Sequence, residues 1–281
     1  EDNNGGSIYI KFFTDIMIQS TVFNKITSHK RGGAIYYVSA NDYSSNDEHN
    51  NFVNYQKNFY SNYNCFSNCI ATYGSAIYGV GKKIEIYFSG TSNCNGKKNE
   101  PSGAQMDIES ESIKSTNLNL TSGESVYAGA MEYRKATSGE FSFQTIVGFK
   151  SCFTIAMSQT GSGLTVSDSN IVDCTLTNNP GNTRPAIYFQ NDGSSTIKNF
   201  RVFGCSVRGA SSNLFDGKFS CVDYENGVEG KGITTIVYLV TDLSMNDVEY
   251  EIANIIISGQ NRYEVNVVET HDIKQLSLGE C

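Results

Sequence analysis

The chain has 281 residues, of which 18% are charged, with three prolines, no tryptophan and a formal net charge of −8 at pH 7. The negative charge disfavours nucleic acid and anionic membrane surfaces as partners. No apolar run approaches the ~18 residues that a membrane-spanning helix requires, and the nearest candidate is the short segment 234–240. We therefore expect no nucleic-acid partner and no membrane insertion within this chain.

A five-residue motif that ends in an aliphatic residue and a tyrosine recurs along the chain. Gly5-Gly6-Ser7-Ile8-Tyr9 is its first copy, and segments 32–36, 74–78, 123–127 and 184–188 repeat it. A motif that returns at similar intervals is typical of a repeat architecture.

A second pattern keeps a fixed distance from this motif. The first apolar residue of each unit is followed nine or ten residues later by a second one, and a third comes eight residues after that. The four instances are Ile8–Ile18–Ile26, Ile77–Ile86–Cys94, Met157–Val166–Cys174 and Ile187–Ile197–Cys205. The period of two around the second residue sends one face of each segment inward.

Three short strands per unit, joined by Gly, Ser and Asn turns, predict an all-β fold, a single right-handed parallel β-helix of about eight to ten coils. Stacked coils bury a continuous core, which one coil alone cannot do. A two-sheet antiparallel sandwich also has short strands and frequent turns, but it does not require a fixed phase. One core column is predicted to hold Ile18, Ile86, Val166 and Ile197, and a second to hold Ile26, Cys69, Cys94, Cys152, Cys174 and Cys205.

The repeat region is expected to span residues 1–231, with polar loops inserted near 39–51 and 95–103. Residues 232–281 lack the tyrosine motif, as terminal coils tend to, so we expect them to be capping coils of the same solenoid. Because the motif is already in phase at Gly5, we expect the chain to be a fragment or mature portion of something longer.

The eight cysteines would suggest a disulfide framework in a small secreted domain. Most of them occupy the column that Ile26 fills in the first coil, which favours inward packing as buried thiols. Neighbours in a column lie within the ~4.4–6.8 Å Cα separation of a disulfide, so a bond between Cys69 and Cys94 remains open, and we expect at most two disulfides. No metal and no cofactor are expected, because Cys65 and Cys69 lack a matching second pair and the three histidines are scattered.

Parallel β-helices include pectate lyases and polygalacturonases, so those activities were weighed. Glycoside hydrolysis needs a pair of carboxylates around the scissile bond. Asp168 and Asp173 are the nearest candidates, but aligning the coils places them over Asn199 and Gly204, which leaves no carboxylate cluster. We therefore expect no catalytic residues and no enzymatic activity, with a polysaccharide lyase or hydrolase as the alternative.

The motif tyrosines are the candidate recognition face. If the preceding aliphatic residues point inward, the tyrosines point outward on one face of the stack. Stacked aromatic rings with a polar edge are common in recognition surfaces, although tyrosine also favours strands for reasons of packing alone. The predicted face consists of Tyr9, Tyr36, Tyr78, Tyr127 and Tyr188.

Two short motifs resemble a known family. Gly-Gly-Ala-Ile at 32–35, Gly-Gly-Ser-Ile at 5–8 and Phe-Tyr-Ser-Asn at 59–62 resemble the GGA-I and F-x-x-N repeats of polymorphic membrane proteins. Segments 64–69 and 74–78 are similar to the Pmp-like β-helix surface proteins of parasitic protists such as trichomonads. The resemblance, over about residues 5–221, implies a surface-exposed adhesive or structural rod. The F-x-x-N repeat occurs once, and any membrane attachment would lie outside the chain.

The leading hypothesis is therefore a non-enzymatic, extracellular or cell-surface rod that acts in adhesion or structural recognition. Its expected partner is a protein or glycan surface ligand, or other copies or segments of a larger assembly. An intracellular structural solenoid is a further alternative, for which unpaired buried cysteines would be natural. Asn119, in the Asn-Leu-Thr sequon, is the candidate glycosylation site.

Overall fold

The computed structural model describes residues 4–11, 15–39, 57–97, 102–126 and 129–151, and beyond them segments 157–161, 164–172, 174–176, 187–190, 196–203, 206–207, 215–221, 235–236, 256–257 and 263–264. After Lys150, Ser169 and Cys174 are the residues whose side chains are described. The described residues form strands and turns, with no helix among them.

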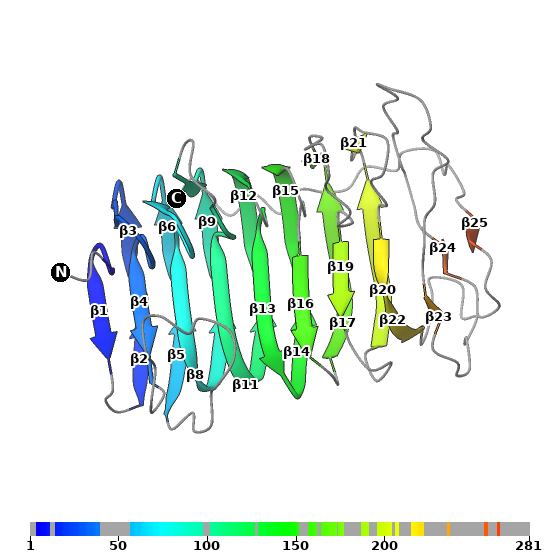
Figure 1. Cartoon of the computed structure of the whole chain (residues 1–281), viewed down its shortest axis with the longest axis horizontal. Coiled ribbons are helices and arrows are strands. Elements are labelled where there is room, and N and C mark those ends of the chain that lie inside the picture. Colours follow the sequence, from blue (N-terminus) through cyan, green and yellow to red (C-terminus); the bar gives the residue numbers. More distant parts are fainter. Residues whose placement is uncertain are drawn as a thin grey trace.

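The strands stack into three parallel ladders that follow one another around each coil (Figure 1). The first ladder contains β1 (Ile8–Lys11), β4 (Ile35–Val38), β8 (Ile77–Tyr87), β11 (Met106–Thr116), β13 (Met131–Ala136), β16 (Met157–Gly161), β19 (Ile187–Gln190) and β22 (Phe215–Cys221). The second contains β2 (Ile16–Gln19), β5 (Asn58–Asn62), the later halves of β8 and β11, β14 (Ser138–Ser142), β17 (Leu164–Val172) and β20 (Thr196–Phe203).

The third ladder contains β3 (Val22–Asn24), β6 (Cys65–Ser67), β9 (Gly90–Ser92), β12 (Asn119–Ser125), β15 (Thr145–Ser151) and the ends of β17 and β20. Short strands extend the coil beyond it, namely β7 (Ile70–Ala71), β10 (Asn95–Gly96), β18 (Thr175–Leu176) and β21 (Ser206–Val207). Four turns are complete between Ile8 and Ser125, and the ladder pairing continues beyond them to β22. The prediction of a stacked parallel β-helix is confirmed.

The expected capping region pairs differently from the coils. Its described strands are β23 (Thr235–Ile236), which is antiparallel to β22, and β24 (Ile256–Ile257) and β25 (Tyr263–Glu264), which are antiparallel to each other. These pairings differ from the parallel stacking expected of further coils of the same solenoid.

The second-ladder core column has the predicted register. Chain pairing places Ile18, Ile86, Val166 and Ile197 in one column, with Ser61, Ser115 and Phe141 filling the levels between them. Ile86 is fully buried and Ile18, in the first coil, is nearly so. Because every coil adds one rung at the same position, the core is continuous through the described coils.

Part of the predicted cysteine column lies among the described residues. Ile70 pairs with Asn95, so Cys69 lies over Cys94, and both are fully buried. Lys150 pairs with Thr175, which places Phe149 over Cys174. Phe149 thus fills the level that the prediction gave to Cys152, and Cys152 itself lies outside the described residues. Cys205 lies outside the described residues, although its neighbour Ser206 pairs with Thr175.

The fourth motif copy, residues 123–127, was also assigned wrongly. Met106 pairs with Ile77 and Met131 pairs with Met106, so these methionines continue the Ile8–Ile35–Ile77 column. Val126 instead directly follows β12, and Tyr127 lies outside the described residues. Methionine satisfies the same apolar position but lacks the tyrosine that would have identified it in the sequence.

The backbone conformation explains why the motif begins with glycine. Gly5, Gly32 and Gly74 all have positive φ, the left-handed region that glycine adopts without steric cost. A Cβ at Gly32 would lie 2.4 Å from the carbonyl oxygen of Ile35. The motif thus marks the corner through which each coil enters the first ladder.

Candidate recognition face

The described tyrosines of the predicted face point outward, but two of the three are buried. Tyr9, Tyr36 and Tyr78 form one column, with ring centroids 4.9 and 5.5 Å apart in parallel stacks. Tyr9 is 45% exposed, whereas Tyr36 and Tyr78 are only 2% and 3% exposed. The prediction of an exposed face is therefore wrong for Tyr36 and Tyr78, and Tyr9 remains accessible in the first coil.

Tyr36 and Tyr78 are buried because they belong to a second hydrophobic cluster, on the outer side of the first ladder. The cluster is completed by Val38 and Val80, with Tyr73 packed against it. The Arg31 guanidinium carbon lies 5.1 Å from the centre of the Tyr78 ring, a cation–π contact. Of the other predicted tyrosines, Tyr188 pairs with Ser158 in the first ladder, and its side chain lies outside those described.

A buried charged cluster continues this outer column into the next coils. Asp107 pairs with Tyr78 and is 1% exposed. The Arg134 Nη2 atom lies 2.6 Å from Asp107 Oδ1, and Arg134 Nε lies 3.7 Å from Glu109 Oε2. Lys135 Nζ is 3.1 Å from Glu109 Oε1. Two buried carboxylates are thus paired with two basic groups, of which Lys135 is partly exposed.

Burial raises the pKa of Asp107 from its ordinary value of 3.8 to about 7, although the positive charge of Arg134 opposes the shift. The Asp107 Oδ2 atom is buried and has no hydrogen-bond partner. A carboxyl group with a raised pKa can exchange a proton near neutral pH. General acid–base catalysis also requires contact with a substrate, which the burial of Asp107 prevents.

The carboxylates predicted from the sequence as the nearest catalytic candidates, Asp168 and Asp173, are different residues from those of this cluster. Asp168 lies in β17 and is aligned with Asn199, since Ser167 pairs with Lys198, so the predicted alignment is confirmed. Asp173 lies outside the described residues. The Asp107 cluster was missed because Met106 was not recognised as the partner of Ile77. Among the described residues, no group of three or more His, Cys, Asp or Glu side chains is arranged to hold a metal ion.

Exposed aromatic side chains gather instead at the corner between the second and third ladders. Tyr63, Phe88 and Phe143 are 55%, 46% and 57% exposed. Each directly follows the second-ladder strand of its coil, so they occupy one column, which we call the aromatic corner. The rings of Tyr63 and Phe88 stack with centroids 5.0 Å apart and an interplanar angle of 11°. Ser20 and Asn117 fill the levels before Tyr63 and between Phe88 and Phe143, and Asp168 of β17 follows Phe143 in the same register.

The five residues of this column from the first to the fifth coil, Ser20, Tyr63, Phe88, Asn117 and Phe143, have a left-handed backbone, with φ values between 45° and 54°. Glycine and asparagine tolerate this region best, and other residues pay roughly 1–2 kcal/mol there. Asn117 follows that preference, whereas the three aromatic residues do not. The aromatic side chains at this corner are therefore not explained by turn geometry.

Buried polar side chains hold the corner in place. Asn64, which follows Tyr63, donates from Nδ2 to the Ile18 carbonyl at 2.8 Å and accepts at Oδ1 from the Thr21 backbone N–H at 2.9 Å. Gln144, which follows Phe143, donates from Nε2 to the Ser115 carbonyl at 3.0 Å. These bonds link adjacent coils and satisfy corner carbonyls that the ladders leave unpaired. The aromatic corner is thus presented on a rigid support.

The outer face of the second ladder adjoins the aromatic corner. Tyr60 and Tyr87 are half-buried on it. Its charges are paired, with Lys83 Nζ 2.5 Å from Glu85 Oε1 and Lys114 Nζ 2.9 Å from Glu140 Oε2. The hydrogen bond from Lys114 holds the pKa of Glu140 below its usual value. This face therefore offers donors and acceptors without a large net charge.

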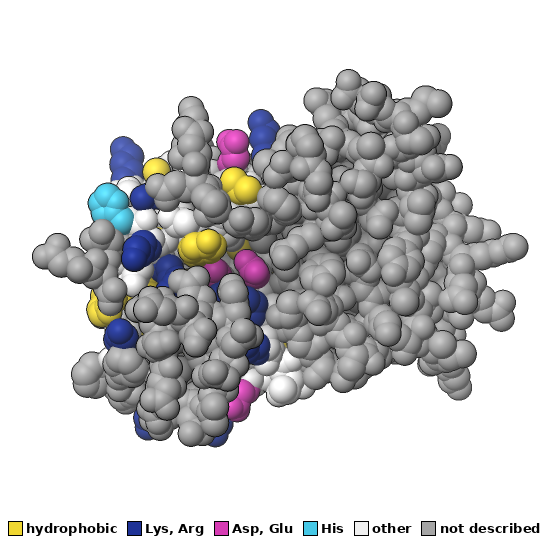
Figure 2. All heavy atoms as spheres, viewed as in Figure 1, with side chains coloured by type: hydrophobic (Ala, Val, Ile, Leu, Met, Phe, Trp, Pro, Cys, Tyr) yellow, Lys and Arg dark blue, Asp and Glu magenta, His cyan; other side chains and the backbone are white. Residues whose placement is uncertain are grey.

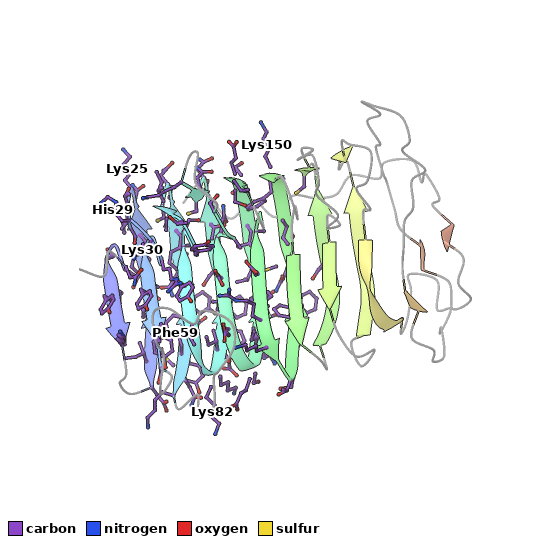
Figure 3. The ribbon with its side chains drawn as sticks, viewed as in Figure 1. Lys25, His29, Lys30, Phe59, Lys82 and Lys150 are labelled. Atoms are coloured by element: carbon purple, nitrogen blue, oxygen red, sulfur yellow. The ribbon has the colours of Figure 1, made fainter. Side chains whose placement is uncertain are left out.

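In the space-filling view, basic and acidic side chains of the described region are interspersed with small hydrophobic spots (Figure 2). In the stick view, Phe59 lies inside the coil, whereas Lys25, Lys82 and Lys150 project from the rims of the stack (Figure 3). Phe59 is fully buried. The phenylalanine of the F-x-x-N sequence is therefore a core residue, and its Asn62 ends β5 just before the aromatic corner.

The fold and site define the chain as a parallel β-helix with an exposed aromatic corner. Comparison with protein-family models, curated proteins and solved structures finds no match. The described part of the chain contains no helix that could span a membrane.

Proposed function

We propose that this chain is a non-enzymatic recognition rod, and that it binds an extended, uncharged glycan along its aromatic corner. The observation that carries the proposal is the column of Tyr63, Phe88 and Phe143, exposed on a left-handed backbone that favours other residue types. Large aromatic side chains retained at a conformational cost on a rigid support are typical of binding surfaces.

The chemistry around the corner favours a neutral sugar chain. Aromatic rings pack against the C–H faces of sugar rings, and the hydroxyl groups need hydrogen-bonding partners beside them. Tyr60, Asn62, Tyr87 and Thr116 lie on the adjoining outer face, outward of the core positions. The carboxylates of that face are paired with lysines, and the chain has a net charge of −8, which disfavours polyanionic ligands.

A binding role is supported over a catalytic one by the position of the Asp107 cluster. Its carboxylates are 1% and 2% exposed and are paired with Arg134 and Lys135. A glycosidase or lyase needs carboxyl groups that reach the bond to be cleaved. The aromatic corner, by contrast, presents three aromatic rings, of which Phe88 and Phe143 carry no titratable group.

An extracellular or cell-surface location is part of the proposal. Cys65 is disulfide-bonded, and disulfides persist mainly in oxidising compartments. Asn119, the proposed glycosylation site, is the first residue of β12 and is half-buried between β9 and β15. The resemblance of the repeats to Pmp-like surface proteins agrees with this location and remains an expectation, as does assembly with other copies or segments.

The test is binding to an array of neutral and charged glycans, followed by incubation of the chain with each bound polysaccharide. We expect binding that is confined to neutral chains and no release of reducing or unsaturated sugars. Release of sugars that is lost in an Asp107→Asn or Asp168→Asn variant would overturn the non-enzymatic proposal. Binding only to polyanions, or to no glycan, would overturn the proposed ligand.

A further inference from the structure

Two buried thiols lie on neighbouring rungs of the core. Cys69 follows β6 and Cys94 follows β9, and the pairing of Ile70 with Asn95 aligns the two cysteines. Both are fully buried and neither is in a disulfide. Parallel neighbours lie about 4.7–4.9 Å apart, which is inside the ~4.4–6.8 Å range of Cα separations that a disulfide spans.

The two sulfur atoms share one polar environment. Cys69 Sγ lies 3.5 Å from the Ser67 carbonyl oxygen, and Cys94 Sγ lies 3.5 Å from the Phe66 carbonyl oxygen. A hydrogen bond between the thiols lowers the pKa of Cys69 and raises that of Cys94, where burial acts in the same upward direction. Cys69 is therefore the thiol that deprotonates more readily, while Cys94 keeps its proton.

We infer that Cys69 and Cys94 form a redox-active dithiol that closes to a disulfide between two neighbouring coils. In the first step, local opening of the coil exposes Cys69, which is fully buried in the closed coil, and its thiolate attacks one sulfur of a small disulfide such as oxidised glutathione and displaces one glutathione thiolate. In the second step, Cys94 loses its proton and attacks the Cys69 sulfur of the mixed disulfide, which releases the second glutathione. Two protein thiols are oxidised to one disulfide, and one oxidised glutathione is reduced to two glutathione thiols.

The same geometry predicts that this bond is reversible. The Cβ atoms of aligned parallel neighbours stand about one strand spacing apart, ~4.8 Å, whereas disulfides prefer Cβ separations of ~3.5–4.5 Å. Closing the bond must pull the two rungs together, and strained disulfides are the labile ones. Cys65, half-buried at the start of β6, is already disulfide-bonded. We therefore expect two classes of disulfide, one persistent and one responsive.

The experiment equilibrates the whole chain in buffers of graded reduced-to-oxidised glutathione ratio, starting in parallel from the fully reduced chain and from chain refolded in oxidised glutathione. Samples are quenched in acid, alkylated under denaturing conditions and mapped by mass spectrometry. We expect a peptide cross-linked through Cys69 and Cys94 in both series, lost at a less reducing ratio than the Cys65 bond. Closing should also raise the thermal unfolding midpoint, since the bond restricts the unfolded chain.

Cys94→Ala and Cys69→Ala are the matched controls, and each should abolish both the cross-link and the redox-dependent shift of the unfolding midpoint. The inference is overturned if Cys69 and Cys94 are both alkylated at every ratio in both series. It is equally overturned if either cysteine accumulates as a stable mixed disulfide with glutathione. Because this test does not involve the aromatic corner, its result is independent of glycan binding.

Discussion

Tyr63 and Phe88 lie one coil apart, with ring centroids separated by 5.0 Å, and both have a left-handed backbone with φ of 52° and 45°. Stacking of two such rings contributes about 0.5–1.5 kcal/mol beyond the burial of their area, which offsets part of the backbone cost at this corner. Phe143 has the same backbone, and the corner level before it is Asn117. Because its neighbour at the preceding level is Asn117 and not an aromatic residue, substitutions of Phe143 measure the backbone cost at this corner without removing a stacked ring pair of the Tyr63–Phe88 kind.

We predict that Phe143→Asn leaves the free energy of unfolding unchanged or raises it by up to about 1 kcal/mol, because asparagine tolerates the left-handed region. Phe143→Val should instead lower it by about 1 kcal/mol or more, since a β-branched residue is strained at positive φ. Chemical denaturation of both variants checks the sign. A lower stability of the asparagine variant than of the valine variant would contradict the backbone assignment.

The burial of the outer cluster predicts losses of stability of different size for two tyrosines of one column. Tyr36→Ser should lower the free energy of unfolding by about 3 kcal/mol or more, because it empties a buried site, whereas Tyr9→Ser should cost much less. The exposed fractions of the two side chains are 2% and 45%. Thermal and denaturant unfolding of the two variants provide the comparison, and equal losses would show that Tyr36 is not buried.

Two glycines with positive φ separate steric clash from backbone preference. A Cβ at Gly32 would lie 2.4 Å from the Ile35 carbonyl oxygen, whereas a Cβ at Gly148 would meet nothing closer than 3.6 Å. Gly148→Ala should cost about 1–2 kcal/mol, the left-handed preference alone. Gly32→Ala should cost clearly more, or prevent folding of the first two coils. Circular dichroism and denaturant titration of both variants decide, and similar losses would argue against the tight corner.

Asp107 predicts a pH dependence of stability with a definite sign. Its pKa rises from 3.8 to about 7 on folding because burial disfavours the charged form, so the folded chain binds this proton more tightly than the unfolded chain. The free energy of unfolding that this group contributes is full below pH 3.8 and falls as pH rises towards about 7. The groups facing Asp107 are Arg134, Glu132, Glu109 and Arg31.

The measurement is the difference in unfolding free energy between the unchanged chain and Asp107→Asn, followed from pH 4 to pH 8. Asparagine cannot ionise. The free energy of unfolding of the unchanged chain, relative to that of the variant, should therefore fall as pH rises and then level off. Glu140→Gln is the control of opposite sign, measured also below pH 4, because Lys114 lowers the pKa of Glu140 from 4.5: its contribution is constant at higher pH and is lost only as pH falls below 4.5. A difference for Asp107 that is constant with pH would contradict the burial of its carboxyl group.

The repeat phase was predictable because burial in a coil depends on simple periodicity. The spacing of Ile18, Ile86, Val166 and Ile197 follows from one rung per coil, and the pairing of the strands confirms it. The assignments that failed involve substitution within a column. Met131 and Phe149 fill apolar positions that the motif assigned to Val126 and Cys152, since any apolar side chain of suitable volume satisfies an interior site.

The exposure of the tyrosines could not be predicted from the strand pattern. Alternation tells which side of a strand a residue faces, but not whether another part of the molecule covers that side. Tyr36 and Tyr78 face outward and are covered, whereas Tyr63 lies at a corner and is exposed. A signal for the corner existed, because Tyr63, Phe88 and Phe143 each come two residues after an inward position and directly before Asn64, Ser89 or Gln144.

The central claim is that the aromatic corner binds a neutral glycan, and calorimetric titration with the best oligosaccharide from the array tests it most directly. The variant Tyr63→Asn/Phe88→Asn/Phe143→Asn keeps residues suited to the left-handed corner, and Ser20→Asn is the matched control at the same backbone position. Each aromatic ring at a binding surface contributes on the order of 1 kcal/mol to the free energy of binding. We predict at least about a 100-fold loss of affinity for the triple variant and no loss for Ser20→Asn. Equal affinities of the triple variant and the unchanged chain would contradict the account.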